Sequence, residues 1–226
     1  SGPATPVERY MTMRMILALT WLCLATMAQA ETRVLVLGDS ILAWNKTRGQ
    51  SIPQLLDNVP GLTVESRAVS GAAFSGSAFL RREIRGQLPR GQWDVIVVNG
   101  GGNDLARECN CRRCDGVLDQ LVSTNGNAGE IPAFLDMLAG RATRVIWLDY
   151  YPVSVRGGPF APCIEELATL EQRMQAAARQ WPHVTFVDAG AVYNRRDLSL
   201  YDPDLIHPTP KGGARIATLL ARTIGR

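Results

Sequence analysis

Ser40 and His207 are residue types that can carry out acyl transfer. Ser40 closes the triplet GDS after an apolar run, and His207 follows Asp204 by three residues. A serine hydroxyl is a weak nucleophile until a base removes its proton, and a histidine held by a carboxylate is such a base. The three residues therefore predict a nucleophile (Ser40), a general base (His207) and the carboxylate that orients it (Asp204).

The oxyanion that forms when a serine attacks an ester needs hydrogen-bond donors around it. The candidates are the backbone N–H groups of Ser40 and Gly71 and the side-chain amide of Asn103. Each motif alone has a simpler explanation, because GDS, VSGAA and GGND are also ordinary turn sequences. The other histidine, His183, precedes a predicted strand and is expected to pack or to face solvent. Four candidate segments in one chain favour catalysis over four unrelated turns.

Apolar runs at fairly regular intervals predict five strands, and segments with helical periodicity or helix-starting residues separate them. The strands are expected at residues 33–38, 62–69, 93–100, 144–150 and 184–189. The helices are expected at residues 51–59, 77–88, 129–140, 163–181 and 211–224, with Ile164, Leu167 and Met174 on one face of the fourth. Residues 110–130 are expected to be mainly irregular. This alternation predicts an α/β fold with three layers, α/β/α, around a five-stranded parallel sheet.

Ligand sites in open parallel sheets lie at the carboxyl ends of the strands. Ser40, Gly71 and Asn103 follow the first three predicted strands, and His207 follows the fifth. We therefore expect all four residues at one edge of the sheet. The glycine motifs lack the spacing of phosphate-binding loops, so a nucleotide site is not favoured.

The order of these segments resembles the SGNH or GDSL hydrolases, whose four sequence blocks contribute Ser, Gly, Asn and His. The matching residues are Ser40 in GDS, Gly71 in VSGAA, Asn103 in GGND and His207 in DPDLIHP, and the similarity spans about residues 32–224. The resemblance implies a flavodoxin-like fold and a serine esterase with a covalent acyl-enzyme. It also implies a triad of Ser40, Asp204 and His207 and an oxyanion hole of Ser40, Gly71 and Asn103. The chain is most similar to small secreted bacterial esterases, including the thioesterase/lysophospholipase type. Neither a cofactor nor a catalytic metal ion is expected.

The first thirty residues are interpreted as a targeting segment. Arg14 precedes an uncharged apolar run that ends in the pattern Ala28-Gln29-Ala30, which is typical of a secretory signal peptide. The run is shorter than the roughly 20 residues that a membrane span needs. We expect a tag remnant or extended start followed by a Sec signal peptide at about residues 11–30, and one hydrolase domain at residues 31–226. The protein is expected to be periplasmic or secreted, without a stable membrane anchor.

Four cysteines follow residue 30, an even number in a chain expected to reach an oxidising compartment. Two disulfides among Cys109, Cys111, Cys114 and Cys163 are favoured over a tetrahedral zinc site. A bond between Cys109 and Cys111 would be the most strained, so Cys163 is expected to bond one of the other three while the remaining two close a small loop. The partner of Cys163 stays open. Its bond is expected to fix the mouth of the cleft more than to stabilise the core.

A net charge of +3 in 226 residues is too small to favour nucleic acid or a membrane surface as a partner. Candidates for lining an acyl or sugar cleft are the aromatic residues Trp44, Phe74, Phe79, Tyr150, Tyr151 and Phe160. The remaining substrate classes are small acyl esters, acylated carbohydrates, and lysolipids or thioesters. Two alternatives stay open: an acyltransferase that uses a carbohydrate acceptor, and a non-catalytic carbohydrate-binding module of the same fold.

Overall fold

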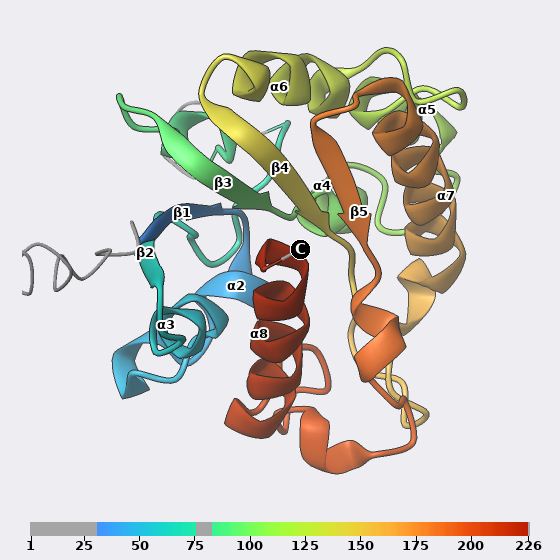
Figure 1. The fold of residues 1–226 in the computed structure, drawn as a ribbon. Helices are drawn as coiled ribbons and strands as arrows, with labels where there is room; N and C mark the ends of the chain where they lie inside the picture. Colours follow the sequence, from blue (N-terminus) through green and yellow to red (C-terminus); the bar gives the residue numbers. More distant parts are fainter. Residues whose placement is uncertain (1–30, 76–82, 226) are drawn as a thin grey trace, which may run out of the picture. The chain divides into compact units, whose positions relative to one another are not determined.

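A five-stranded sheet in which every neighbouring pair of strands is parallel organises the chain (Figure 1). The computed structural model describes residues 31–75 and 83–225. The strands are β1 (Thr32–Leu37), β2 (Leu62–Ser66), β3 (Trp93–Val98), β4 (Ala142–Leu148) and β5 (Val184–Val187). Their order across the sheet is β2-β1-β3-β4-β5. The predicted fold class and all five predicted strands are confirmed, with ends that differ by a few residues.

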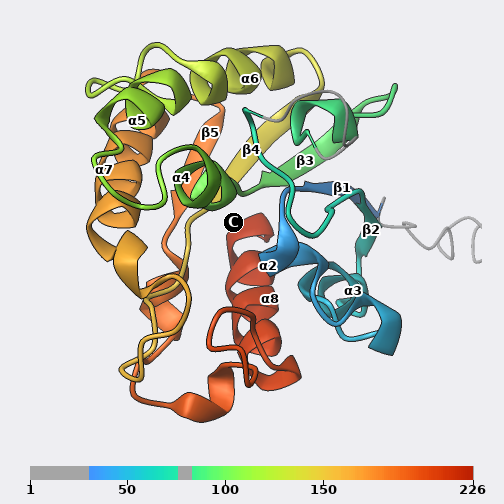
Figure 2. The same cartoon turned by 180° about the vertical axis from the view of Figure 1, so that it is seen from behind.

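The helices lie on both faces of this sheet (Figures 1 and 2). One face is covered by α2 (Ser40–Ala43), α3 (Ile52–Asp57) and α8 (Pro210–Ile224). The other is covered by α4 (Gly102–Glu108), α5 (Asp115–Leu121), α6 (Glu130–Ala139) and α7 (Ile164–Gln180). The described residues 31–75 and 83–225 belong to one compact unit.

The sheet has a hydrophobic core on each face, and alternate side chains of the inner strands point into one core or the other. Leu35 and Leu37 of β1 pack toward α4–α7, whereas Val34 and Val36 pack toward α3 and α8. Successive side chains of a strand point to opposite faces, so a strand covered on both sides must be apolar throughout. The continuous Val, Leu and Ile runs that predicted buried parallel strands therefore supply both cores at once.

The helix predictions differ from the structure at several places. Residues 115–121 form α5 although this stretch was expected to be irregular, and α4 was not predicted. Residues 83–88 of the predicted helix 77–88 contain only a bridge and a short 3-10 helix at 85–87, while residues 77–82 lie outside the described part. Ile164 is 44% exposed, because the first turn of α7 extends beyond the core that Leu170 and Met174 reach.

The carboxyl ends of the strands meet at one edge of the sheet, as parallel pairing requires. Chain segments 38–44, 67–75, 99–108, 149–163 and 188–209 leave from this edge. They contain every predicted catalytic residue. Within residues 31–75 and 83–225, no helix is both long enough and apolar enough to cross a membrane.

Candidate active site

His207 and Asp204 form a hydrogen-bonded pair in the segment between β5 and α8. Asp204 Oδ2 lies 2.5 Å from His207 Nδ1, and Asp204 Oδ1 accepts the backbone N–H groups of Ile206 (2.9 Å) and His207 (3.0 Å). Partial burial acts to raise the pKa of Asp204, but hydrogen bonds from His207 and Ile206 outweigh it and hold the pKa below its usual value. Asp204 therefore stays ionised at neutral pH and can stabilise an imidazolium.

The indole of Trp44 stacks on the imidazole of His207. The two ring centroids are 3.7 Å apart and the ring planes differ by 6°. Trp44 is itself fixed, because its Nε1 donates a 3.0 Å hydrogen bond to Asp202 Oδ2. The histidine is thus restrained on its edge by Asp204 and on one face by Trp44, and its side chain is only 13% exposed.

Ser40 begins α2, and the geometry of the turn before it depends on glycine. Gly38 has φ +146°, and a Cβ at this position would lie 2.1 Å from Asn99 Oδ1. Asp39 caps α2 by accepting the N–H of Ile41 at 2.9 Å. The Ser40 hydroxyl has no hydrogen-bond partner among the described residues, and catalytic hydrogen bonds often tighten only when substrate is present.

The predicted oxyanion donors are held by neighbouring bonds. The Asn103 amide donates to Ala72 O at 2.9 Å, which ties α4 to the loop that contains Gly71 (φ +75°). The buried carboxylate of Asp104 strengthens this link by accepting the N–H of Ser75 at 2.6 Å. In the described ranges, the backbone N–H groups of Ser40 and Gly71 have no partner. These groups and the second amide hydrogen of Asn103 are available to a ligand.

An apolar pocket opens beside Ser40 and Asn103. Its walls come from the segment after β4, from α7 and from the loop before His207, and they include Tyr150, Tyr151, Pro152, Val153, Phe160, Leu167, Leu205 and Ile206. Three of the six aromatic candidates therefore line this pocket. Phe74 instead lies in the core against Phe134 and Trp147, and Phe79 lies outside the described residues.

Two polar side chains that sequence analysis did not single out hold the turn before Ser40. Asn99 exchanges hydrogen bonds with Asp39, accepting its N–H at 3.1 Å and donating to its Oδ1 at 3.2 Å. Gln87 binds both the N–H (2.7 Å) and the carbonyl (2.9 Å) of Gly38. Asn99 could have been found as a polar residue directly after a buried strand, whereas nothing in the sequence around Gln87 indicates its partner.

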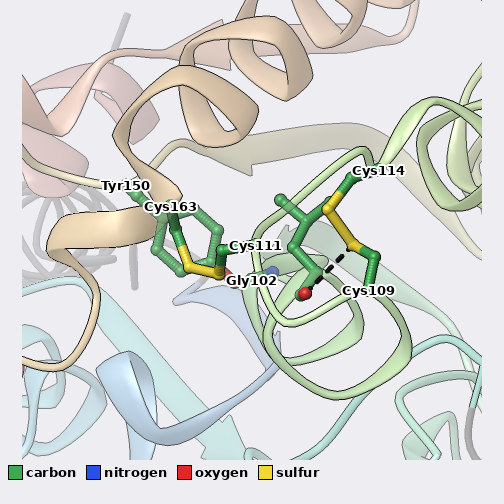
Figure 3. The surroundings of a disulfide bond; sticks show 7 residues. Gly102, Cys109, Cys111, Cys114, Tyr150 and Cys163 are labelled. Carbon is green, nitrogen blue, oxygen red and sulfur yellow. Dashed lines mark hydrogen bonds between the residues drawn. A yellow bond between two sulfur atoms is a disulfide. The ribbon is translucent and has the colours of Figure 1, made fainter.

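The cysteines lie in two pairs at disulfide-bonding separation. Cys109 pairs with Cys114 (Cα–Cα 5.4 Å) and Cys111 pairs with Cys163 (4.7 Å), as Figure 3 shows. This pairing is compatible with the two predicted disulfides. Cys111 and Cys163 are buried in the core beside α4 and α7, so their bond belongs to the interior and not only to the mouth of the cleft.

The fold and its carboxyl edge define an α/β protein with a GDS turn after β1 and a histidine–carboxylate pair before the last helix. The profile of the GDSL-like lipase/acylhydrolase family matches residues 36–215. The chain therefore belongs to this family and is a hydrolase that acts on ester bonds.

Solved structures share the fold at low sequence identity. A catalytic variant of an acetylxylan esterase from Geobacillus stearothermophilus is 18% identical, with a TM-score of 0.60 over 86% of this chain and 94% of the other. An α/β hydrolase from the metagenome of Lake Arreo is 17% identical, with a TM-score of 0.63 over 87% and 96%. A search of curated proteins gave no match.

Proposed function

We propose that this protein is a serine esterase that hydrolyses small carboxylic esters through a covalent acyl-enzyme. Ser40 Oγ attacks the ester carbonyl while His207 Nε2 takes its proton, and Asp204 orients the imidazole and stabilises its charge. The proton passes from His207 to the departing alcohol as the acyl–oxygen bond breaks. Water then attacks the acyl-enzyme by the same route, which releases the acid and restores Ser40.

The observation that supports this proposal is that a restrained base and free donors lie in segments that leave the same edge of the sheet. His207 is held by Asp204 and Trp44, while the N–H groups of Ser40 and Gly71 lack partners among the described residues. Donors fixed in advance around a developing oxyanion are usually a large contribution to catalysis.

The surroundings of Ser40 favour a small acyl group and a polar alcohol. The pocket beside Ser40 is apolar and suits an acyl chain. A second hollow adjoins Trp44 and is more polar than the first, with Asn45, Lys46, Arg48, Ser70 and Asp202 among the residues of its walls. Because His207 must hand its proton to the departing alcohol and stacks on Trp44, this hollow is the expected place for the alcohol, which supports acylated carbohydrates as substrates.

Hydrolysis of p-nitrophenyl acetate by three variants tests the mechanism. Ser40→Ala and His207→Ala should each lose nearly all activity, and the double variant should be little slower than either, because the two residues act as one unit. His183→Ala is the matched control, since His183 Nε2 contacts Leu135 O at the opposite end of β5. A double variant much slower than both single variants, or an active Ser40→Ala protein, would contradict the proposal.

A series of p-nitrophenyl esters of increasing acyl length, run beside acetylated polysaccharide, tests the substrate class. Rates are expected to be highest for short acyl chains, with release of acetate from the polysaccharide. A clear preference for long chains would instead indicate lysolipids or thioesters. Formation of an acylated polyol when a polyol is added would indicate acyl transfer.

A further inference from the structure

Tyr150 connects the two segments that carry the nucleophile and an oxyanion donor. It follows β4, and its hydroxyl oxygen accepts the backbone N–H of Gly102 at 2.9 Å. The same hydroxyl donates to Asp39 Oδ2 at 2.6 Å. Asp39 directly precedes Ser40, and Gly102 directly precedes Asn103. Asn99 links the two segments directly at Asp39, and among the described residues Tyr150 is the side chain from a third segment that hydrogen-bonds both.

The partners fix which atom donates. A backbone N–H can only donate, so the phenol oxygen must accept from Gly102 and its own proton must point to Asp39. Asp39 Oδ1 receives Ile41 N and Asn99 Nδ2. Tyr150 is thus one of three donors to Asp39; burial raises the pKa of that carboxyl, and these hydrogen bonds oppose the rise. Burial, together with the neighbouring Asp39, raises the pKa of Tyr150 well above its usual value, so the phenol keeps this proton.

The phenol of Tyr150 packs closely against the start of α4. A Cβ on Gly102 would lie 3.0 Å from both Cζ and the hydroxyl oxygen of Tyr150. Gly102 N–H is one of the first donors of α4, which no side chain of the cap residue satisfies. The phenol takes the place of that missing cap. Figure 3 shows Tyr150 and Gly102 beside the Cys111–Cys163 pair, and the ring packs against the core that contains both cysteines.

We propose that Tyr150 is a positioning residue that sets the place of the Asn103 amide relative to Ser40. Its hydroxyl is committed to Gly102 and Asp39 and takes no part in the proton transfers. Its hydroxyl fixes the start of α4 against the turn before α2, so that the donor and the nucleophile face the same carbonyl. This inference rests on the proposed serine esterase mechanism. A displacement of about 1 Å in such a constellation can cost on the order of a hundredfold in rate.

The test is Tyr150→Phe, which keeps the ring and removes only the hydroxyl. We expect kcat for p-nitrophenyl acetate to fall about tenfold to a hundredfold while KM stays within about twofold, because the loss concerns the transition state. The matched control is Tyr193→Phe, which removes a buried phenol hydrogen bond to Leu200 O and should leave kcat nearly unchanged. Thermal unfolding of both variants shows whether the loss reflects stability.

A double variant separates positioning from general damage. If Tyr150 acts through the Asn103 amide, adding Tyr150→Phe to Asn103→Ala should cost much less than it costs the parent protein. If Tyr150→Phe does not fold, Gly102→Ala displaces the same phenol and should give the same fall in kcat. An unchanged kcat in Tyr150→Phe would overturn the inference. So would a double variant whose loss of kcat equals the product of the two single losses.

The two proposals fail in different ways. An active Ser40→Ala protein would reject the serine mechanism itself. An inactive Ser40→Ala protein with a fully active Tyr150→Phe protein would reject only the role of Tyr150.

Discussion

Asn103, one of the predicted oxyanion donors, is fixed in place by the protein itself. One hydrogen of its amide is committed to Ala72 O, which fixes the orientation of the group. The other hydrogen remains for a ligand in the pocket that Asn103 shares with Ser40. A side-chain amide held by one bond is preorganised to donate the second, and this is the property that an oxyanion site needs.

Asn103→Ala should therefore lower kcat for p-nitrophenyl acetate by about a hundredfold or more with little change in KM, since the donor engages mainly in the transition state. Steady-state kinetics measure both constants. Asn127→Ala, in the loop before α6, serves as the control for a lost surface amide. A raised KM with an unchanged kcat would mean that Asn103 binds the ground state instead.

The segment between α4 and α5 contains Cys111, which pairs with Cys163 directly before α7. Cys111 and Cys163 are 52 positions apart in sequence, whereas Cys109 and Cys114 are only five apart. In the chain-entropy description, closing the longer loop stabilises the fold by about 4 kcal/mol and closing the shorter by about 2 kcal/mol. The longer connection also lies beside Tyr150 and Gly102 (Figure 3).

Replacing Cys111 and Cys163 together by serine should thus reduce the free energy of unfolding more than replacing Cys109 and Cys114. It should also lower kcat/KM for p-nitrophenyl esters, because the packing behind Tyr150 is loosened. Denaturant unfolding and kinetics of the two double variants provide the comparison. Equal effects of the two pairs on both measurements would contradict this expectation.

Asp149 makes the stability of the whole domain depend on pH. It lies directly after β4 and is 5% exposed. Burial, and then the nearby carboxylates of Glu171 and Asp188, raise its pKa to about 8. An unfolded Asp has a pKa of about 3.9, so between these two values the folded state holds a proton that the unfolded state has released. Stability contributed by this group is present below pH 4 and is lost as the pH rises toward 8.

Asp149→Asn should therefore stabilise the protein at pH 8 much more than at pH 5, by about 1.4 kcal/mol for each pH unit within this range. Urea unfolding at several pH values measures the difference. Asp115→Asn, at the exposed start of α5, is the control for a lost surface carboxylate. Parallel pH profiles of the parent protein and Asp149→Asn would show that the carboxyl is not protonated in the fold.

The sequence alone was sufficient for the strands, the fold class and the sheet edge at which the candidate catalytic segments lie. A strand that is apolar along its whole length, such as β1, has to be buried on both faces of the sheet. Strands that are joined through helices pair in parallel. Parallel pairing in turn brings Ser40, Asn103 and His207 to one edge of the sheet. These inferences depend on local composition and chain order, which a single sequence contains.

Only the tertiary structure decided which distant side chains meet. Asp39 and Tyr150 are separated by 111 positions, and Asn99 stands 60 positions from Asp39, yet all three share one hydrogen-bond network. The stacking of Trp44 on His207 and the pairing of the cysteines are of the same kind. Short helices such as α4 and α5 were missed because seven residues carry too little periodicity, and their stability comes from packing and end contacts. Such contacts depend on distances in the folded chain, and the spacing of residues along the sequence does not contain those distances.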